Sequence, residues 1–164
     1  MLLYHINFGW PLVDKGTRIL WNGNWESPTP DSKAKIFKKG SDFRTCPSPL
    51  DAHSGTGEDV AFIDVSSNSK GFAYCGLYNQ KLNLAVALSF PKKQLPWLTN
   101  WQHWGTNEYV TALEPATNPP IGQSKARDDG NLIFLKPGES RNYTLELEVL
   151  KTEEIDKFLN NFKK

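Results

Sequence analysis

Three apolar segments separated by short polar turns constrain the fold of this chain more than any other feature of its sequence. They cover residues 60–65, 71–78 and 82–90. Segments of this length, rich in β-branched and aromatic residues and bounded by Asn, Ser and Lys, are typical of β-strands. Their short spacing predicts an antiparallel meander. The later segments are apolar at nearly every residue, so we expect both faces to be covered, as between packed sheets.

Further strand-like segments lie on both sides of these three. They cover residues 2–8, 16–21, 109–114, 132–135 and 141–150. The last segment has the most regular alternation, with Leu145, Leu147 and Val149 on one face and glutamates on the other. About eight strands in all predict an all-β fold, a sandwich of antiparallel strands.

The remaining segments are predicted to be irregular or helical. Residues 22–31 and 45–59 are rich in Gly and Pro and are predicted to be loops. The aromatic segment 95–104 is predicted to be an irregular wall or a short helical turn. Residues 152–164 are predicted to form a short C-terminal helix, because Thr152 can cap it and an apolar stripe follows.

Length and composition indicate one globular domain. The chain has 164 residues and a net charge of +1, with acidic and basic residues mixed along it. We therefore expect neither nucleic acid nor a membrane as a partner. Cys46 and Cys75 are too few for a disulfide framework, and no secretory signal precedes them. We predict free thiols in a cytoplasmic protein and leave a homodimer open.

One carboxylate stands at the end of an otherwise apolar strand. In the strand of residues 109–114, Glu114 shares a face with Val110 and Ala112, and Pro115 follows it directly. A carboxylate at a strand end, followed by a rigid loop, can hold an acid or a base at the rim of a pocket. The alternative interpretation is a solvated charge, and spacing alone favours that alternative.

The sequence contains three histidines. His5 alternates with Tyr4 and Ile6, and a strand histidine is more often structural than catalytic. His53 lies in a long loop, where we expect it to be solvated. His103 stands between tryptophans, where a pocket wall and a packed aromatic cluster are equally good interpretations.

Motifs for metals, phosphates and nucleotides are missing from the sequence. One histidine, one carboxylate, six tryptophans and several amides remain. Aromatic faces pack on the apolar side of a sugar ring, while amides and carboxylates bind its hydroxyl groups. The sequence therefore favours an uncharged polyhydroxylated ligand and no cofactor.

Three sequence motifs together resemble the aldose 1-epimerase, or galactose mutarotase-like, superfamily. They are LYHINFGWPL near the start, NEYVTALEPATNPPIG at residues 107–122, and the ending PGESRNYTLELEVL. The most specific parts are Tyr-His-Ile-Asn-Phe-Gly and Leu-Glu-Pro-x-x-Asn. The chain is most similar to a little-characterised branch of short bacterial proteins, over essentially its whole length.

This resemblance implies a fold, a reaction and a set of residues. The fold is a twisted β-supersandwich that binds a sugar on one sheet. His5 matches the general acid that acts on the ring oxygen, and Glu114 matches the general base that acts on the anomeric hydroxyl. The residues expected to bind the sugar are Asn7, Trp101, Gln102, His103, Asn118 and Glu58. Asp59 is the alternative to Glu58 as the acid that contacts a sugar hydroxyl.

The chain also departs from the family pattern. Family members are typically about twice as long, and this chain corresponds to their C-terminal half or somewhat more. We therefore expect residues 1–164 to form one galactose mutarotase-like domain that is incomplete on its N-terminal side. The first hypothesis is a cofactor-free sugar epimerase. The second is a carbohydrate-binding protein without turnover, and the third is a structural half-sandwich completed by another chain.

Overall fold

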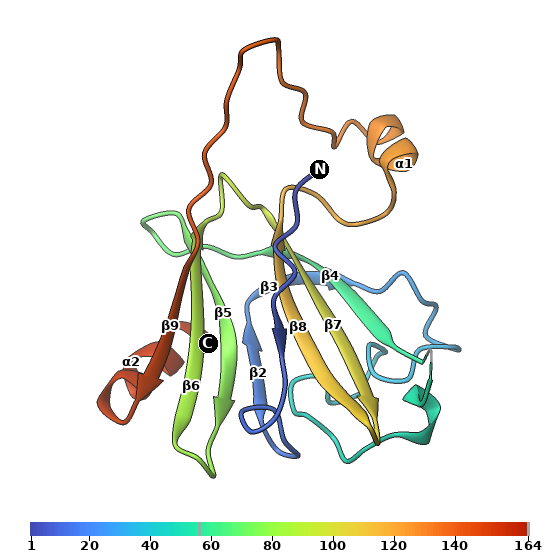
Figure 1. Ribbon diagram of the computed structural model, residues 1–164, viewed down its shortest axis with the longest axis vertical. Helices are drawn as coiled ribbons and strands as arrows, with labels where there is room; N and C mark the ends of the chain where they lie inside the picture. Colours follow the sequence, from blue (N-terminus) through green and yellow to red (C-terminus); the bar gives the residue numbers. More distant parts are fainter. Residues whose placement is uncertain (56, 164) are drawn as a thin grey trace.

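The computed structural model describes residues 1–55 and 57–163, which form two antiparallel β-sheets (Figure 1). One sheet has five strands in the order β1-β8-β7-β4-β3, and the other has four in the order β2-β5-β6-β9. The five-stranded sheet consists of β1 (Asn7–Phe8), β3 (Gly23–Glu26), β4 (Asp59–Val65), β7 (Trp97–Gly105) and β8 (Glu108–Ala116). The four-stranded sheet consists of β2 (Arg18–Trp21), β5 (Phe72–Asn79), β6 (Leu84–Pro91) and β9 (Glu146–Lys151). The predicted all-β sandwich is confirmed.

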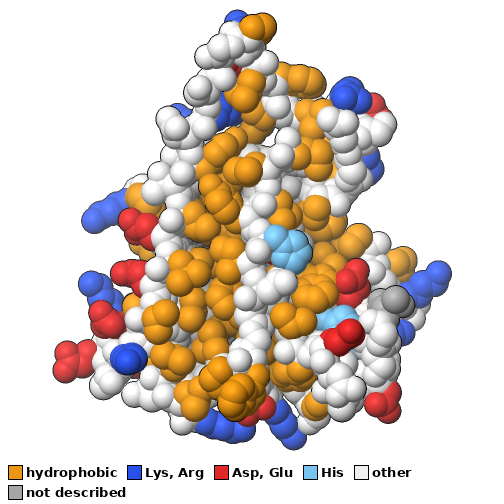
Figure 2. Space-filling view, in the orientation of Figure 1, with side chains coloured by type: hydrophobic (Ala, Val, Ile, Leu, Met, Phe, Trp, Pro, Cys, Tyr) orange, Lys and Arg blue, Asp and Glu red, His pale blue; other side chains and the backbone are white. Residues whose placement is uncertain are grey.

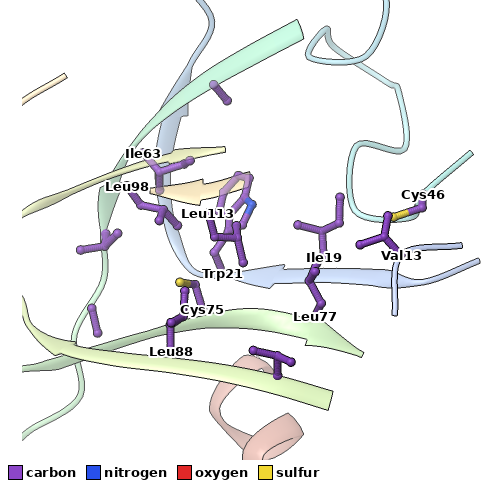
Figure 3. Packing of buried hydrophobic residues seen from close by; sticks show 14 of the residues in the cluster. Val13, Ile19, Trp21, Cys46, Ile63, Cys75, Leu77, Leu88, Leu98 and Leu113 are labelled. Atoms are coloured by element: carbon purple, nitrogen blue, oxygen red, sulfur yellow. The ribbon is translucent and has the colours of Figure 1, made fainter. Parts of the chain in front are cut away.

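The main core lies between the two sheets. Alternate residues of each strand point inward, as the twofold repeat of a strand requires. Figure 3 shows Ile63 and Leu98 of the five-stranded sheet on one side of Trp21, with Cys75 and Leu88 of the other sheet opposite. These side chains are almost completely buried. The central position of Trp21 lets one residue of β2 contact both sheets.

The helices are short, and the last of them covers the outer face of the four-stranded sheet. They are α1 (Gln123–Asp128) and α2 (Glu153–Leu159), with 3-10 turns at Asp51–His53 and Asn160–Phe162. Ile155 and Phe158 of α2 form a second apolar cluster with Ala85 and Ala87 of β6 (Figure 1). Gly76 of β5 leaves room for this helix, because a Cβ there would lie 2.8 Å from the ring of Phe158. The predicted C-terminal helix is confirmed.

The three-strand meander predicted for residues 60–90 is wrong in part. β5 and β6 form the predicted hairpin, with Ala73 opposite Phe90. β4, however, lies in the other sheet between β3 and β7. Both sheets present apolar faces to the same core, so a short connection can cross the sandwich and still bury the next strand.

The segment 95–104 was predicted to be irregular, and that prediction is wrong. It contains β7, a nine-residue strand that pairs with β4 on one side and β8 on the other. Its inward positions include Asn100 and Gln102, which are buried polar residues. These amides hide the expected alternation, but they bond one another at 3.0 Å and Asn100 also bonds the Ala112 carbonyl at 2.9 Å.

Smaller differences concern four other segments. The predicted loop 22–31 contains strand β3, and residues 132–135 do not form the predicted strand. In the segment 2–8 only β1 is regular, although the backbone amide of Tyr4 still donates a hydrogen bond to the carbonyl of Pro115 in β8. In β9, Leu147 and Val149 have the predicted alternation but are about half exposed, because this strand is at the sheet edge.

Both cysteines are buried free thiols, as expected from their number.

The helices within the described residues fall short of the length and hydrophobicity that a bilayer-spanning helix needs.

Candidate functional site

The outer face of the five-stranded sheet carries most of the polar residues that the sequence indicated. In β8, Leu113 and Tyr109 contact the core, so Val110, Ala112 and Glu114 point to the other face. Figure 2 shows histidine side chains at the surface among hydrophobic ones, with acidic side chains next to one of them. This face is therefore mixed in character, as a sugar-binding surface would be.

His5 and Glu114 lie next to each other on this face. Asn7 of β1 pairs with Ala112 of β8, and the same antiparallel register brings His5 opposite Glu114. The imidazole Nε2 is 3.1 Å from the carboxylate Oε1. His5 and Glu114 are 109 residues apart in the sequence, but in the fold they are cross-strand neighbours.

The surroundings of Glu114 differ from those of an ordinary surface carboxylate. The residue is 4% exposed, and this burial raises the pKa of its carboxyl, while His5 lowers the pKa and Glu58 raises it. The Oε1 atom has no hydrogen-bond partner among the described residues, although His5 is close, so that contact has the distance of an ion pair without the alignment of a hydrogen bond. Glu114 is therefore a buried carboxyl group with one oxygen that has no hydrogen-bond partner among the described residues, and with an increased affinity for a proton.

A second row of side chains lies beside this pair. Ala112 pairs with Asn7 on one side and with Trp101 of β7 on the other. Ala112 has only a methyl group, so the smallest side chain of this row lies between the larger side chains of Asn7 and Trp101. The indole Nε1 of Trp101 donates a hydrogen bond to the carboxylate of Glu58. Asn7 and Trp101 thus flank Ala112, which precedes Glu114 by two residues on the same face of β8, and Glu58 contacts Trp101.

Strand alternation separates the two acids between which the sequence could not choose. Glu58 is on the outer face with Trp101, whereas Asp59 is 2% exposed and points inward. The Asp59 carboxylate accepts backbone hydrogen bonds from Ile36 and Phe37. Asp59 therefore fixes a loop, and Glu58 remains the candidate for a sugar hydroxyl.

His103 is also on the outer face, but its ring nitrogens already have protein neighbours. Nδ1 is 2.7 Å from the Glu108 carbonyl, and Nε2 is 3.3 Å from the Gly55 carbonyl. The ring lies 5.8 Å from that of Trp101, measured between centroids. A packed aromatic cluster describes this position better than an open pocket wall, and its contact with a sugar stays a prediction.

Gln102 and Asn118 were also expected to bind the ligand. Gln102 points into the core, is fully buried, and receives a 3.1 Å hydrogen bond from the Trp104 indole. Its position is at odds with the prediction, because it faces away from Glu114. Asn118 follows β8 and is buried, with its amide bonded to the Pro119 carbonyl at 3.0 Å and its oxygen bonded to Thr117 at 2.9 Å. Its role in binding stays a prediction.

Two buried polar residues differ from what the sequence led us to expect. His53 was expected to be solvated, but it is fully buried and its Nδ1 accepts the backbone amide of Trp104 at 3.0 Å. Burial lowers the pKa of this imidazole, which favours its neutral form. Thr99 of β7 lies directly opposite Glu114 and is 3% exposed. The sequence could not reveal Thr99, because the segment around it was assigned as irregular.

Within residues 1–55 and 57–163, no group of three or more His, Cys, Asp or Glu side chains is placed to hold a metal ion.

The fold matches part of a solved crystal structure. The chain superposes on the crystal structure of a protein described as a "putative aldose 1-epimerase" from Klebsiella pneumoniae subsp. pneumoniae MGH 78578, with a TM-score of 0.80 and 24% sequence identity. The match covers 98% of this chain and 43% of the other, so this chain spans less than half of that protein's length.

Family membership follows from a second comparison. Residues 1–149 match the family described as a domain of unknown function (DUF4432), and the chain belongs to that family. A search of curated proteins found no match.

Proposed function

We propose that this protein is an aldose 1-epimerase-like isomerase that interconverts the anomers of a free sugar by acid and base catalysis. The observation that carries the proposal is the 3.1 Å separation of the His5 imidazole and the Glu114 carboxylate on one sheet face. Groups this close can act together on two oxygens only if these oxygens are close neighbours. The ring oxygen and the hydroxyl oxygen of a hemiacetal, which share one carbon, meet this condition.

The reaction needs one base and one acid. Glu114 takes the proton of the anomeric hydroxyl while the bond from the anomeric carbon to the ring oxygen breaks. The electron pair of that bond goes to the ring oxygen, which takes a proton from His5. Rotation of the open-chain aldehyde and closure with the proton transfers reversed give the other anomer. Both residues return to their starting protonation states.

The environment of each residue suits its role. Burial raises the pKa of Glu114, and a base with a higher pKa takes a proton more readily once it is ionised. His5 is 58% exposed and can exchange protons with the solvent between turnovers. Histidine is the side chain whose ordinary titration lies near neutral pH, so it can serve as the acid.

Glycoside hydrolysis fits the same residues less well. Glycosidases typically use two carboxyl groups that flank the scissile bond about 5 to 9.5 Å apart. Here one carboxyl and one imidazole are in contact on the same face. The arrangement therefore favours isomerisation at one carbon over cleavage between two sugars.

A second candidate function is binding of a carbohydrate without turnover. Binding needs fewer groups than catalysis, and the chain spans 43% of the length of the Klebsiella protein. Trp101, Asn7 and Glu58 would still offer an aromatic face and polar groups to a sugar.

One experiment separates the two functions. Freshly dissolved single anomers of a panel of aldoses are mixed with the protein, and optical rotation is followed with time. The proposal expects faster equilibration than in buffer, and it expects Glu114→Gln to remove the acceleration. No acceleration with any aldose, together with a sugar-dependent change in tryptophan fluorescence, would instead support the binding protein.

A further inference from the structure

Two buried polar atoms on the outer face lack hydrogen-bond partners among the described residues, and they are neighbours. They are the Oγ1 atom of Thr99 and the Oε1 atom of Glu114. These residues are 3% and 4% exposed, and they lie directly opposite each other on β7 and β8. Buried polar groups are almost always hydrogen-bonded, so two adjacent exceptions indicate a shared partner.

The chemistry of the two atoms defines that partner. Opposite residues of an antiparallel pair point to the same side, with Cβ atoms about 4.5 to 5.5 Å apart. The Thr99 hydroxyl can donate one hydrogen bond, and the ionised Glu114 carboxylate can only accept. A group that accepts from Thr99 and donates to Glu114 satisfies both. A hydroxyl group on a ligand has this combination of donor and acceptor.

We propose that Thr99 holds the anomeric oxygen of the sugar while Glu114 removes its proton, an inference that rests on the proposed function. The Thr99 hydroxyl donates to this oxygen, and the anomeric O–H donates to Glu114. As the proton moves to Glu114, the oxygen becomes the carbonyl oxygen of the aldehyde, and the ring oxygen takes the proton of His5. The Thr99 hydrogen bond remains on the oxygen where negative charge develops, so it stabilises the transition state.

The same contact determines which ligands bind. A free reducing sugar has a hydroxyl at the anomeric carbon and satisfies Thr99 and Glu114 together. A 1-O-methyl glycoside has no proton to donate to Glu114, and its methyl group points toward two buried residues. The site is therefore expected to select free sugars over their methyl glycosides.

Two variants test the role of Thr99. Thr99→Val keeps the size and β-branching of the side chain but removes the hydroxyl, and Thr99→Ser restores the hydroxyl. Losing one such donor typically slows catalysis by about 10²- to 10³-fold, and we expect about 10- to 100-fold for this neutral group. The loss is expected mainly in kcat, with Thr99→Ser recovering most of the rate. Thermal unfolding of Thr99→Val should match or exceed that of wild type, because the variant removes an unpaired buried hydroxyl.

A direct bond between Thr99 and Glu114 would have a different signature. It would shift the acidic limb of the pH–rate profile in Thr99→Val and leave the plateau kcat unchanged. That result would overturn the proposal, and so would equal loss of rate in Thr99→Val and Thr99→Ser.

A binding measurement separates this inference from the proposed function. Tryptophan fluorescence is titrated with a free aldose and with its methyl glycoside, using wild type and Thr99→Val. Wild type should prefer the free sugar, and Thr99→Val should lose most of that preference. If wild type does not turn over but shows this preference, the proposed reaction fails while the contact of Thr99 stands. Equal binding of both ligands by wild type, or no binding of either, overturns the inference.

Discussion

Two histidine–glutamate pairs lie on the same face of the same sheet, with burial reversed between them. In the first, the His5 side chain is 58% exposed and that of Glu114 is 5% exposed, at a separation of 3.1 Å. In the second, the His103 side chain is 7% exposed and that of Glu108 is 60% exposed, at 3.5 Å. Both glutamates belong to β8 and are six residues apart.

The difference shows that burial, more than residue type, decides what such a pair can do. The buried carboxyl of Glu114 has a raised pKa and an oxygen without a hydrogen-bond partner within the described residues. The buried ring of His103 has carbonyl oxygens next to both nitrogens. Ligand binding is proposed only at the first pair, because both ring nitrogens of the second pair already have protein neighbours.

The largest expected effect compares the two glutamates in catalysis. Glu114→Gln keeps the shape of the side chain but removes the base, and loss of a general base typically lowers the rate by about 10²- to 10⁴-fold. Glu108→Gln is the matched control and should leave the rate unchanged. Polarimetry with a single anomer measures both. Equal rates for the two variants would break the distinction between the pairs.

The second prediction compares the two histidines in stability. His103→Ala removes a buried ring and leaves carbonyl oxygens without it, so we expect about 2 to 3 kcal/mol lower free energy of unfolding. His5→Ala changes an exposed side chain and should cost less than about 1 kcal/mol. Urea unfolding followed by tryptophan fluorescence gives both values. The reverse order would mean that the ring of His5, and not that of His103, anchors the sheet.

The third prediction concerns pH. Burial raises the pKa of Glu114 above its ordinary value near 4.5, so the folded state binds this proton more tightly than the unfolded state. The contribution of Glu114 to stability is therefore present below that ordinary value and is lost as pH rises through the raised pKa. In Glu114→Gln this loss is missing, so the Tm of the variant minus that of wild type should increase over this range and then level off. A difference that stays constant with pH would contradict the raised pKa.

The smallest expected effect belongs to the exposed member of the second pair. The Glu108 carboxylate is mostly solvated, and exposed ion pairs typically contribute about 0.2 to 1 kcal/mol. We expect Glu108→Gln to change the free energy of unfolding by less than about 0.5 kcal/mol. A larger change in the same urea experiment would show that this ion pair, and not only the carbonyl contacts, holds the ring of His103.

Local sequence patterns were enough to predict the strands in which apolar and polar residues alternate or in which nearly every residue is apolar. β5, β6 and β8 were predicted with their approximate limits. The helix α2 begins after Thr152 as expected, but the Thr152 side chain makes no capping hydrogen bond. β7 was missed because amides occupy its inward positions, and these amides are acceptable in a core only after β8 and Trp104 satisfy them. The wrong assignment of β7 also hid Thr99.

The sequence by itself determined the sandwich class and the two residues, His5 and Glu114, on which the candidate site depends. Strand alternation predicts the sandwich class and the motif resemblance identifies the two residues, because both signals are local in the chain. Only the tertiary structure decided that β4 leaves the expected meander, that Gln102 points into the core, and that Thr99 faces Glu114. Pairing partners and burial depend on which strands meet across the sheet, and that choice is made by the packing of the whole chain.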